Sequence, residues 1–291
     1  MAEAIIINGL ISGGIYAILA IGFSLIFGVA KILNMAHTAF YMVTGYFIYI
    51  ILSKFGVSLF IADIAAVILT VLVAIICYQL FFDRVKEQHN AVMIISIALA
   101  MLFQEIFTIA FGSEHKSIPS FITGYVELMG GVRITWQHVV ALGFFLLSII
   151  LMWILLQFTK LGKTIRVVSE DREIANLMGI NVSKICLITI CISSLLAGLA
   201  GVFVIPLFSL NPTMWSAPLV VILAAVVLGG LGSVWGSIIG AFILGFAETI
   251  VTFVVPMGSF LGGAVSLIIM ILVLLVRPEG LFGVVFEGER L

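Results

Sequence analysis

Long apolar runs, separated by short polar segments, dominate the pattern of hydrophobic and polar positions along the chain. A helix needs about 20 predominantly apolar residues to cross a bilayer, and several of these runs reach that length. Strand-length alternation of apolar and polar residues is absent, which favours helices over a barrel. The pattern predicts an all-α polytopic transmembrane bundle of eight or nine spans, over residues 5–29, 36–53, 57–82, 91–111, 136–158, 185–207, 218–231, 235–255 and 260–276.

Two of these runs differ from an ordinary spanning helix. The second, "MAHTAFYMVTGYFIYII", is rich in aromatic and polar side chains, and the seventh, "PLVVILAAVVLGGLGS", is short and ends in glycines. Irregular backbone at membrane depth is tolerated only where it is buried in protein or lines a water-filled cavity. Either run is therefore a candidate for a re-entrant or broken helix.

Composition agrees with a membrane protein. Of 291 residues, 63% are hydrophobic and 9% are charged, whereas about a quarter of a soluble domain is charged. The formal net charge of −1 provides no basic field, so nucleic acid is not expected as a partner. The segments between the runs are shorter than the roughly 50 residues of an independent domain, so residues 1–291 are expected to form one transmembrane domain. Neither a disulfide framework nor a metal site is indicated by the three cysteines, Cys77, Cys186 and Cys191, which lie in or beside apolar runs.

The basic residues predict the orientation in the membrane. They concentrate in three segments, which are residues 159–184 (Lys160, Lys163, Arg166, Arg172 and Lys184), the loop with Arg84 and Lys86, and the C-terminal tail that begins at Arg277. Because cytoplasmic loops carry the excess of lysine and arginine, these segments and the C-terminus are expected in the cytoplasm. The N-terminus, with no basic residue before its apolar run, is expected outside.

Segment 159–184 contains Gly162-Lys163-Thr164, which looks like the end of a nucleotide-binding P-loop. Gln157 occupies the place of the first P-loop glycine, and a membrane helix rather than a strand precedes it. The segment instead has the pattern of two short amphipathic helices, with Asp171 or Ser169 as an N-cap and Gly179 as a left-handed C-cap. Their apolar positions are Ile165, Val168, Ile174, Leu177 and Met178. An ordinary interfacial loop is the alternative.

The stretch "EDREIANLMGINVSKICLITICISSLLAGLAGVF" resembles the cytoplasmic loop and following helix of permease subunits in the branched-chain amino-acid family of bacterial ABC importers. Three other stretches agree with that family in the same order: "NGLISGGIYAILAIGFSLIFGVAKILNMAH", "VVLGGLGSVWGSIIGAFILGFAE" and "VRPEGLFG". Together they span nearly the whole chain, so their joint occurrence is specific although each alone is weak.

The resemblance implies a multi-pass permease of the bacterial cytoplasmic (inner) membrane, which is not itself an enzyme and holds no cofactor. Its implied partners are a second permease subunit, two ATP-binding subunits that hydrolyse ATP, and an extracytoplasmic solute-binding protein. Its implied solutes are branched-chain or related neutral amino acids, with urea or short amides as alternatives. The residues that it assigns to coupling with the ATPases are Arg166, Glu170, Asp171, Ala175 and Gly179. A secondary transporter driven by an ion gradient is the rival class.

Polar residues within the spans are candidates for the solute path, because polar groups at membrane depth are costly. The candidates are Asn8, Ser12 and Gly13 in the first span and Asn34 and His37 just after it. A plain helix-packing seam is the alternative for the first three, and a hydrogen-bonded helix cap is the alternative for His37. Gly232, Gly236 and Gly240 form a ladder of small residues that packs helices closely, either within the chain or at the contact with a second subunit.

Several acidic or amide side chains also fall within the predicted spans. They are Asp63 in the third span, Gln104 and Glu105 in the fourth, and Glu248 in the eighth. An ionised carboxylate at the bilayer centre costs about 3 kcal/mol on insertion scales. Each of these groups is therefore expected to face protein, water or a partner rather than lipid.

Overall fold

The computed structural model describes residues 2–85, 88–127 and 133–282. Over these ranges the chain is a bundle of α-helices with one small hairpin of two short strands. The long helices are α1 (Ala2–Ala30), α2 (His37–Phe55), α3 (Leu59–Cys77), α4 (His89–Phe111), α5 (Trp136–Phe158), α8 (Val182–Val204) and α10 (Val234–Val254). The shorter helices are α6 (Lys160–Glu170), α7 (Arg172–Leu177), α9 (Ser216–Gly229) and α11 (Gly262–Val276), with a π-helical turn η1 (Tyr78–Phe82) and a 3-10 turn η2 (Gly258–Phe260). The strands are β1 (Tyr125–Glu127) and β2 (Arg133–Thr135), which pair antiparallel with Val126 opposite Ile134.

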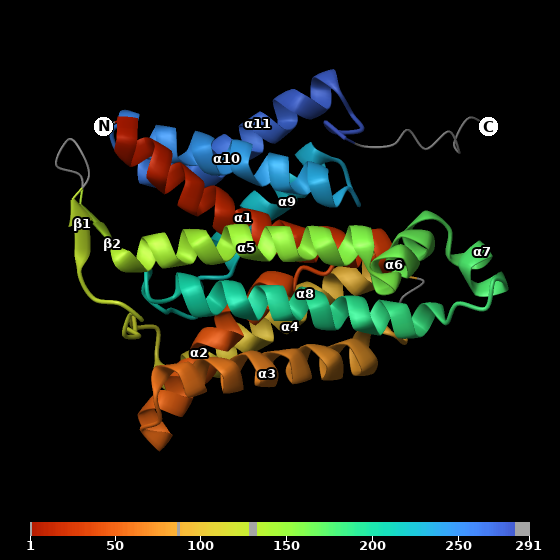
Figure 1. Ribbon diagram of the computed structural model, residues 1–291, viewed down its shortest axis with the longest axis horizontal. Helices are drawn as coiled ribbons and strands as arrows, with labels where there is room; N and C mark the ends of the chain where they lie inside the picture. Colours follow the sequence, from red (N-terminus) through yellow and green to blue (C-terminus); the bar gives the residue numbers. More distant parts are fainter. Residues whose placement is uncertain (1, 86–87, 128–132, 283–291) are drawn as a thin grey trace.

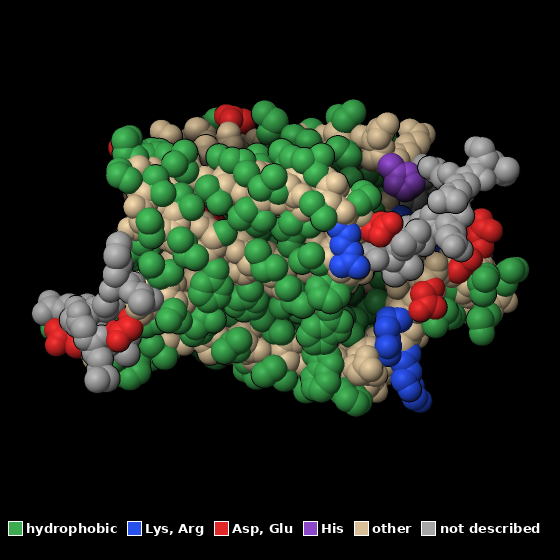
Figure 2. Space-filling view, turned by 90° about the horizontal axis from the view of Figure 1, so that it is seen from above, with side chains coloured by type: hydrophobic (Ala, Val, Ile, Leu, Met, Phe, Trp, Pro, Cys, Tyr) green, Lys and Arg blue, Asp and Glu red, His purple; other side chains and the backbone are tan. Residues whose placement is uncertain are grey.

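The helices run mostly along the long axis of the molecule, and α1 passes through the middle of the bundle (Figure 1). Helices α2, α3, α4 and α8 lie on one side of α1, and α9, α10 and α11 on the other. The N-terminus and the β-hairpin lie at one end of the long axis, and α6 and α7 lie at the other (Figure 1). Hydrophobic side chains cover the middle of the surface, whereas charged side chains gather near the two ends (Figure 2). The two ends therefore correspond to the two faces of a membrane.

The predicted fold class is confirmed. In the described part of the chain, seven helices are long and apolar enough to cross a membrane, and α9 and α11 are shorter apolar helices. The predicted span 57–82 corresponds to α3 continued by η1, and the predicted span 185–207 begins and ends three residues earlier as α8. Of the basic residues used to predict orientation, Lys86 lies outside the described residues.

Helix α1 is central because it is apolar around its whole circumference, and such a helix can be buried on every side. In the 18-residue apolar stretch of α1, 78% of the residues are buried, whereas 22% are buried in the corresponding stretch of α5. Glycines let neighbouring backbones approach it closely: a Cβ on Gly9 would overlap the ring of Phe246, and one on Gly13 would meet the backbone of Phe242 at 3.2 Å. The α1–α10 contact is therefore a small-residue seam.

The two atypical runs depart from an ordinary span in different ways: α2 is an unbroken helix that begins inside the bundle, and α9 is short. After α1 ends at Ala30, residues 31–36 turn back into the bundle, and His37 at the start of α2 hydrogen-bonds the Leu19 carbonyl at 3.1 Å. Leu19 lies about 16 Å before the end of α1 by helix rise, so α2 begins deep inside the bundle. Helix α9 has only 14 residues and gives way to a tight turn, in which Gly230 and Gly232 have φ of 100° and 85°.

The glycines of the small-residue ladder pack α10 against α9 within this chain. A Cβ on Gly236 would overlap the Gly229 carbonyl group, and a Cβ on Gly240 would overlap the carbonyl oxygen of Ala225. Gly232 is not part of this contact, because it lies in the α9–α10 turn beside Gly28 of α1. At Gly236 and Gly240 the small-residue ladder therefore forms a contact between two helices of the same chain.

Candidate functional site

The end of the molecule formed by α6 and α7 is the first candidate site, and its geometry begins at the corner between α5 and α6. Thr159 is the N-cap of α6, and its Oγ1 accepts a hydrogen bond from the Gly162 amide at 3.0 Å. A Cβ at Gly162 would overlap the backbone of Leu155 and Leu156 in the last turn of α5. Gly162 thus permits a close helix–helix corner, which accounts for the glycine of the P-loop-like sequence without a nucleotide.

The caps of α7 have the geometry that their sequence predicts. Asp171 is the N-cap, and its Oδ1 accepts a hydrogen bond from the Ile174 amide at 2.9 Å. Gly179, with φ of 83°, follows the helix, and the Ile180 amide closes the turn on the Ala175 carbonyl at 3.0 Å. Ser169 is not a cap, since its hydroxyl donates to the Arg166 carbonyl in the same helix. The α6–α7 segment (residues 160–179) is therefore an ordered unit.

The apolar positions of this segment divide between two surfaces. Ile165 and Val168 of α6 are buried against the bundle. Three apolar side chains of α7 and its C-cap instead point outward, with exposed fractions of 55% for Ile174, 87% for Leu177 and 71% for Met178. Together these three side chains form an apolar outer surface on α7, where apolar side chains of this size would ordinarily be buried.

Arg172 fastens the α6–α7 segment to the bundle. Its Nε donates a hydrogen bond to the Val29 carbonyl in the last turn of α1 at 2.8 Å, and its Nη2 contacts Cys186 Sγ of α8 at 3.7 Å. Burial, and next the positive charge of Arg172, lower the pKa of Lys31. From the sequence alone, Arg172 is only one of the basic residues of segment 159–184. Its role depends on a contact with a residue 143 positions away, which no local signal reveals.

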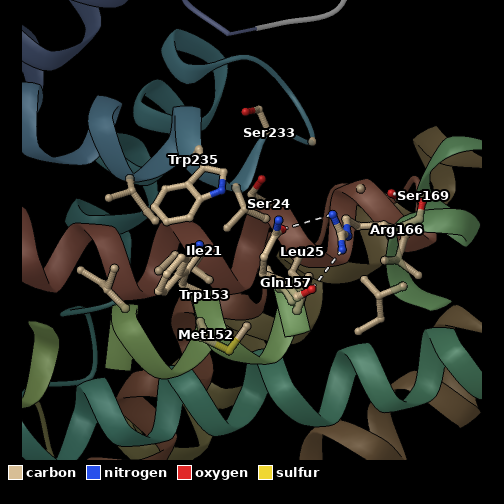
Figure 3. A pocket seen from close by; sticks show the side chains of 18 residues that line it. Ile21, Ser24, Leu25, Met152, Trp153, Gln157, Arg166, Ser169, Ser233 and Trp235 are labelled. Atoms are coloured by element: carbon tan, nitrogen blue, oxygen red, sulfur yellow. Dashed lines mark hydrogen bonds between the residues drawn. The ribbon is translucent and has the colours of Figure 1, made fainter. Parts of the chain in front are cut away.

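A cavity of about 390 Å³ lies behind the α6–α7 segment, between α1, α5, α6 and the start of α10 (Figure 3). Its walls are mostly apolar, with Trp153 and Trp235 on two sides and Ser24 on α1. Arg166 donates to the side-chain Oε1 of Gln157 at 3.2 Å and to the backbone carbonyl oxygen of Gln157 at 3.4 Å. These two hydrogen bonds connect α6 to the end of α5. A movement of α6 would therefore change the shape of this cavity.

Asn34 and His37 are buried in the turn between α1 and α2. The Asn34 Oδ1 accepts from the Ala36 amide at 3.1 Å, and the His37 Nε2 lies 3.1 Å from the Leu19 carbonyl and directly over Gly22. Their remaining nitrogens, Asn34 Nδ2 and His37 Nδ1, have no hydrogen-bond partner among the described residues. Buried polar atoms normally find a partner, so these two nitrogens are places where water or a polar solute group would be stabilised.

The first three candidates for the solute path lie elsewhere, in the half of α1 nearer the N-terminus. Asn8 Nδ2 donates to the Ala4 carbonyl of its own helix at 2.8 Å. Gly13 is packed against α10, where a Cβ on Gly245 would meet the Gly13 Cα at 2.6 Å. Ser12 is half-buried next to this contact. The geometry here is that of a packing seam, and the structure does not bring these residues together with Asn34 and His37.

Two long-range polar contacts hold α1 in place, and the sequence alone predicts neither pair. Tyr16 of α1 donates to Glu248 of α10 at 2.7 Å, and Ser193 of α8 donates to the Gly22 carbonyl of α1 at 2.8 Å. The sequence predicts that Glu248 faces protein, water or a partner, and its tyrosine partner agrees with this. The tyrosine partner lies 232 positions away and could not be inferred from spacing.

The fold is that of a multi-pass membrane protein, and the α6–α7 segment is an ordered unit at one face with an exposed apolar surface. The model of the family described as branched-chain amino acid transport system / permease component matches residues 5–274, and the chain belongs to this family. It is an ABC importer permease, and in these systems the membrane subunit works with other ABC-system chains.

Relatives with known names are similar to this chain over nearly the full length of both proteins. The high-affinity branched-chain amino acid transport system permease protein LivH of Escherichia coli K12 is 28% identical, over 95% of this chain and 94% of its own. The corresponding protein BraD of Pseudomonas aeruginosa is 28% identical, over 96% and 94%. Among solved structures, PsaBC from Streptococcus pneumoniae in complex with Fab matches with a TM-score of 0.54 at 16% identity, covering 94% of this chain and 91% of that chain, which supports the fold alone.

Proposed function

We propose that this chain carries branched-chain or related neutral amino acids inward across the cytoplasmic membrane, and that ATP hydrolysed on separate subunits drives the transport. The relatives LivH and BraD are branched-chain amino acid permeases by name. The single observation that carries the coupling role is the apolar outer surface of α7, formed by Ile174, Leu177 and Met178 on a segment that is capped and fastened to the bundle. An exposed apolar surface of this kind fits a groove on a partner protein.

The orientation that we propose places α6 and α7 in the cytoplasm. Four of the basic residues of segment 159–184 belong to α6 and α7 themselves, and cytoplasmic segments carry the excess of such residues. The segment after α11 returns to the same end, because the amides of Leu281 and Phe282 bond the carbonyls of Leu228 and Gly229 at 2.8 and 3.0 Å. This arrangement supports a cytoplasmic C-terminus and an external N-terminus and β-hairpin.

The proposed mechanism follows from the attachment points of the α6–α7 segment. When the two ATPase subunits close, a force on the outer surface of α7 is transmitted through Arg172 to α1 and through Arg166 and Thr159 to α5. Since α1 is the central helix and α5 a peripheral one, their relative movement would tilt the bundle between inward-open and outward-open states. The partners in this mechanism are a second permease subunit, two ATP-binding subunits and an external solute-binding protein.

Uptake by the reconstituted complex tests this proposal. Proteoliposomes that contain the chain with its co-purified subunits should transport labelled leucine only when ATP is present on the side of the membrane where the ATPase subunits lie. The solute-binding protein and the leucine are added on the opposite side. An imposed proton or sodium gradient without ATP should give no uptake, and uptake under those conditions would support the secondary transporter instead. Excess unlabelled isoleucine or valine should compete, whereas competition only by urea or acetamide would assign the chain to the amide carriers.

A further inference from the structure

Helix α4 packs against the rest of the chain by one side only. Its phenylalanines repeat every four residues and meet the aromatic rings of α2, with ring centroids 4.2 Å apart for Phe107 and Tyr46 and 6.2 Å apart for Phe103 and Phe40. A residue two positions from a phenylalanine is rotated by about 200° around the helix axis. Glu105, midway between Phe103 and Phe107, therefore projects from the opposite side, away from the bundle.

Glu105 is exposed there on a stripe that is otherwise apolar. The large exposed hydrophobic residues of this helix are Ile94, Ile97, Met101, Leu102, Ile106 and Ile109. By helix rise Glu105 lies about 9 Å before the end of α4, inside the apolar part of the span. Exposed apolar side chains precede and follow it, so lipid on this stripe would surround a carboxyl group with hydrocarbon, which is costly.

Two hydrogen bonds orient this carboxyl group. The Trp215 Nε1, at the start of α9, donates to the Gln104 Oε1 at 2.9 Å, and the Gln104 Nε2 donates to the Glu105 Oε1 at 3.3 Å. No lysine or arginine among the described residues forms an ion pair with Glu105. The group is thus positioned by neutral donors and is available to a cation from outside this chain.

We propose that the exposed stripe of α4 faces a second permease subunit across the solute path, and that Glu105 binds the ammonium group of the passing amino acid there. The inference rests on the proposed function and adds a site to it. The stripe lies on the outside of the single-chain bundle, so a second subunit is needed to enclose a path along it. Charge complementarity selects the ligand group, because an ammonium supplies both the positive charge and the donors that a carboxylate accepts.

The test uses the complete importer complex with the three cysteines of this chain replaced, carrying Glu105→Cys or, as a matched control, Ile68→Cys. Ile68 is an apolar residue of α3, 55% exposed, with no polar group expected to face it. A positively charged, membrane-impermeant methanethiosulfonate reagent should modify the cysteine at 105 and spare the one at 68, because only a thiol in contact with water forms the reactive thiolate. Excess leucine should slow the modification at 105.

Uptake by Glu105→Gln and Glu105→Asp supplies an independent readout. Glu105→Gln removes the charged partner of the ammonium group, so leucine uptake should be about tenfold slower. Glu105→Asp keeps the charge and should keep most of the rate. Equal, slow modification of the cysteines at 105 and 68, or normal uptake in Glu105→Gln, would overturn the inference while leaving the proposed function intact. If the complex without substitutions transported no neutral amino acid, the proposed function would be wrong. The rate of thiol modification at position 105 would still show whether water reaches that position.

Discussion

Arg172 is the point at which the α6–α7 segment is fastened to α1, and replacing it by methionine should loosen α7. Its Nε donates to the Val29 carbonyl at 2.8 Å, in the last turn of α1, where the helix dipole places partial negative charge. Methionine keeps an unbranched side chain of similar reach and removes all donors. The Arg172→Met variant therefore tests the attachment with little change in packing.

The size of the effect follows mainly from the hydrogen bond to Val29, because the contact of Nη2 with Cys186 Sγ is long, at 3.7 Å. A hydrogen bond from a charged donor contributes about 1.5–3 kcal/mol. The variant also removes the repulsion between Arg172 and Lys31, which is the smaller of the two causes that lower the Lys31 pKa, so part of the loss is offset. A net loss of about 2 kcal/mol corresponds to about a 30-fold rise in the population with α7 detached.

Hydrogen–deuterium exchange in lipid nanodiscs would measure that population directly. Amides of residues 172–178 should exchange about 30-fold faster in Arg172→Met, if exchange proceeds through the detached state. Lys184→Met removes the same charge from an exposed position close by and should leave the exchange of α7 unchanged. If exchange in α7 were the same in Arg172→Met as in the parent protein, the argument that this hydrogen bond holds the segment would be wrong.

Three further changes probe the docking surface, the cap and the core. Leu177 is 87% exposed, so Leu177→Asn should leave the melting temperature unchanged while abolishing co-purification of the ATPase; retained co-purification would show that α7 is not the docking surface. Asp171→Ala removes an N-cap of about 1 kcal/mol and should speed exchange in α7 about fivefold, with no effect on the exchange of α10 as the internal control. Gly240→Val would force α10 from the Ala225 carbonyl, so its monodisperse yield in detergent should collapse, whereas Gly143→Val, with open space around the Cβ, should elute normally. Equal yields from the two valine variants would contradict the packing argument.

The spans could be predicted from sequence because the thickness of the hydrocarbon core fixes the length of an apolar helix. The caps of α7 were predictable for a similar reason, since Asp171 and Gly179 act on amides and carbonyls within their own turn. Both features depend only on residues close together in the chain. The α6–α7 segment and its boundaries are therefore predictable from the sequence.

The remaining features depend on contacts between distant residues. Several runs are uniformly apolar, and the pattern alone does not show that α1 is the one enclosed by the others, with Gly9 and Gly13 packed on α10 and Gly22 bonded to Ser193 of α8. The depth at which α2 begins is set by the contact of His37 with Leu19, and the attachment of α7 is set by Arg172 and Val29. Composition and spacing do not determine such pairs. For the same reason, the sequence could name five candidate path residues but could not show that Asn8, Ser12 and Gly13 lie apart from Asn34 and His37 in the fold.

The most direct test of the central claim is a pull-down of the tagged chain from native membranes in mild detergent, with and without residues 164–179 replaced by a Gly/Ser linker. The parent chain should bring down an ATP-binding subunit and a second permease, and the chain with the linker should lose the ATP-binding subunit while it remains in the membrane. Recovery of the parent chain alone, or recovery of the ATP-binding subunit by both chains, would contradict the coupling role of residues 164–179.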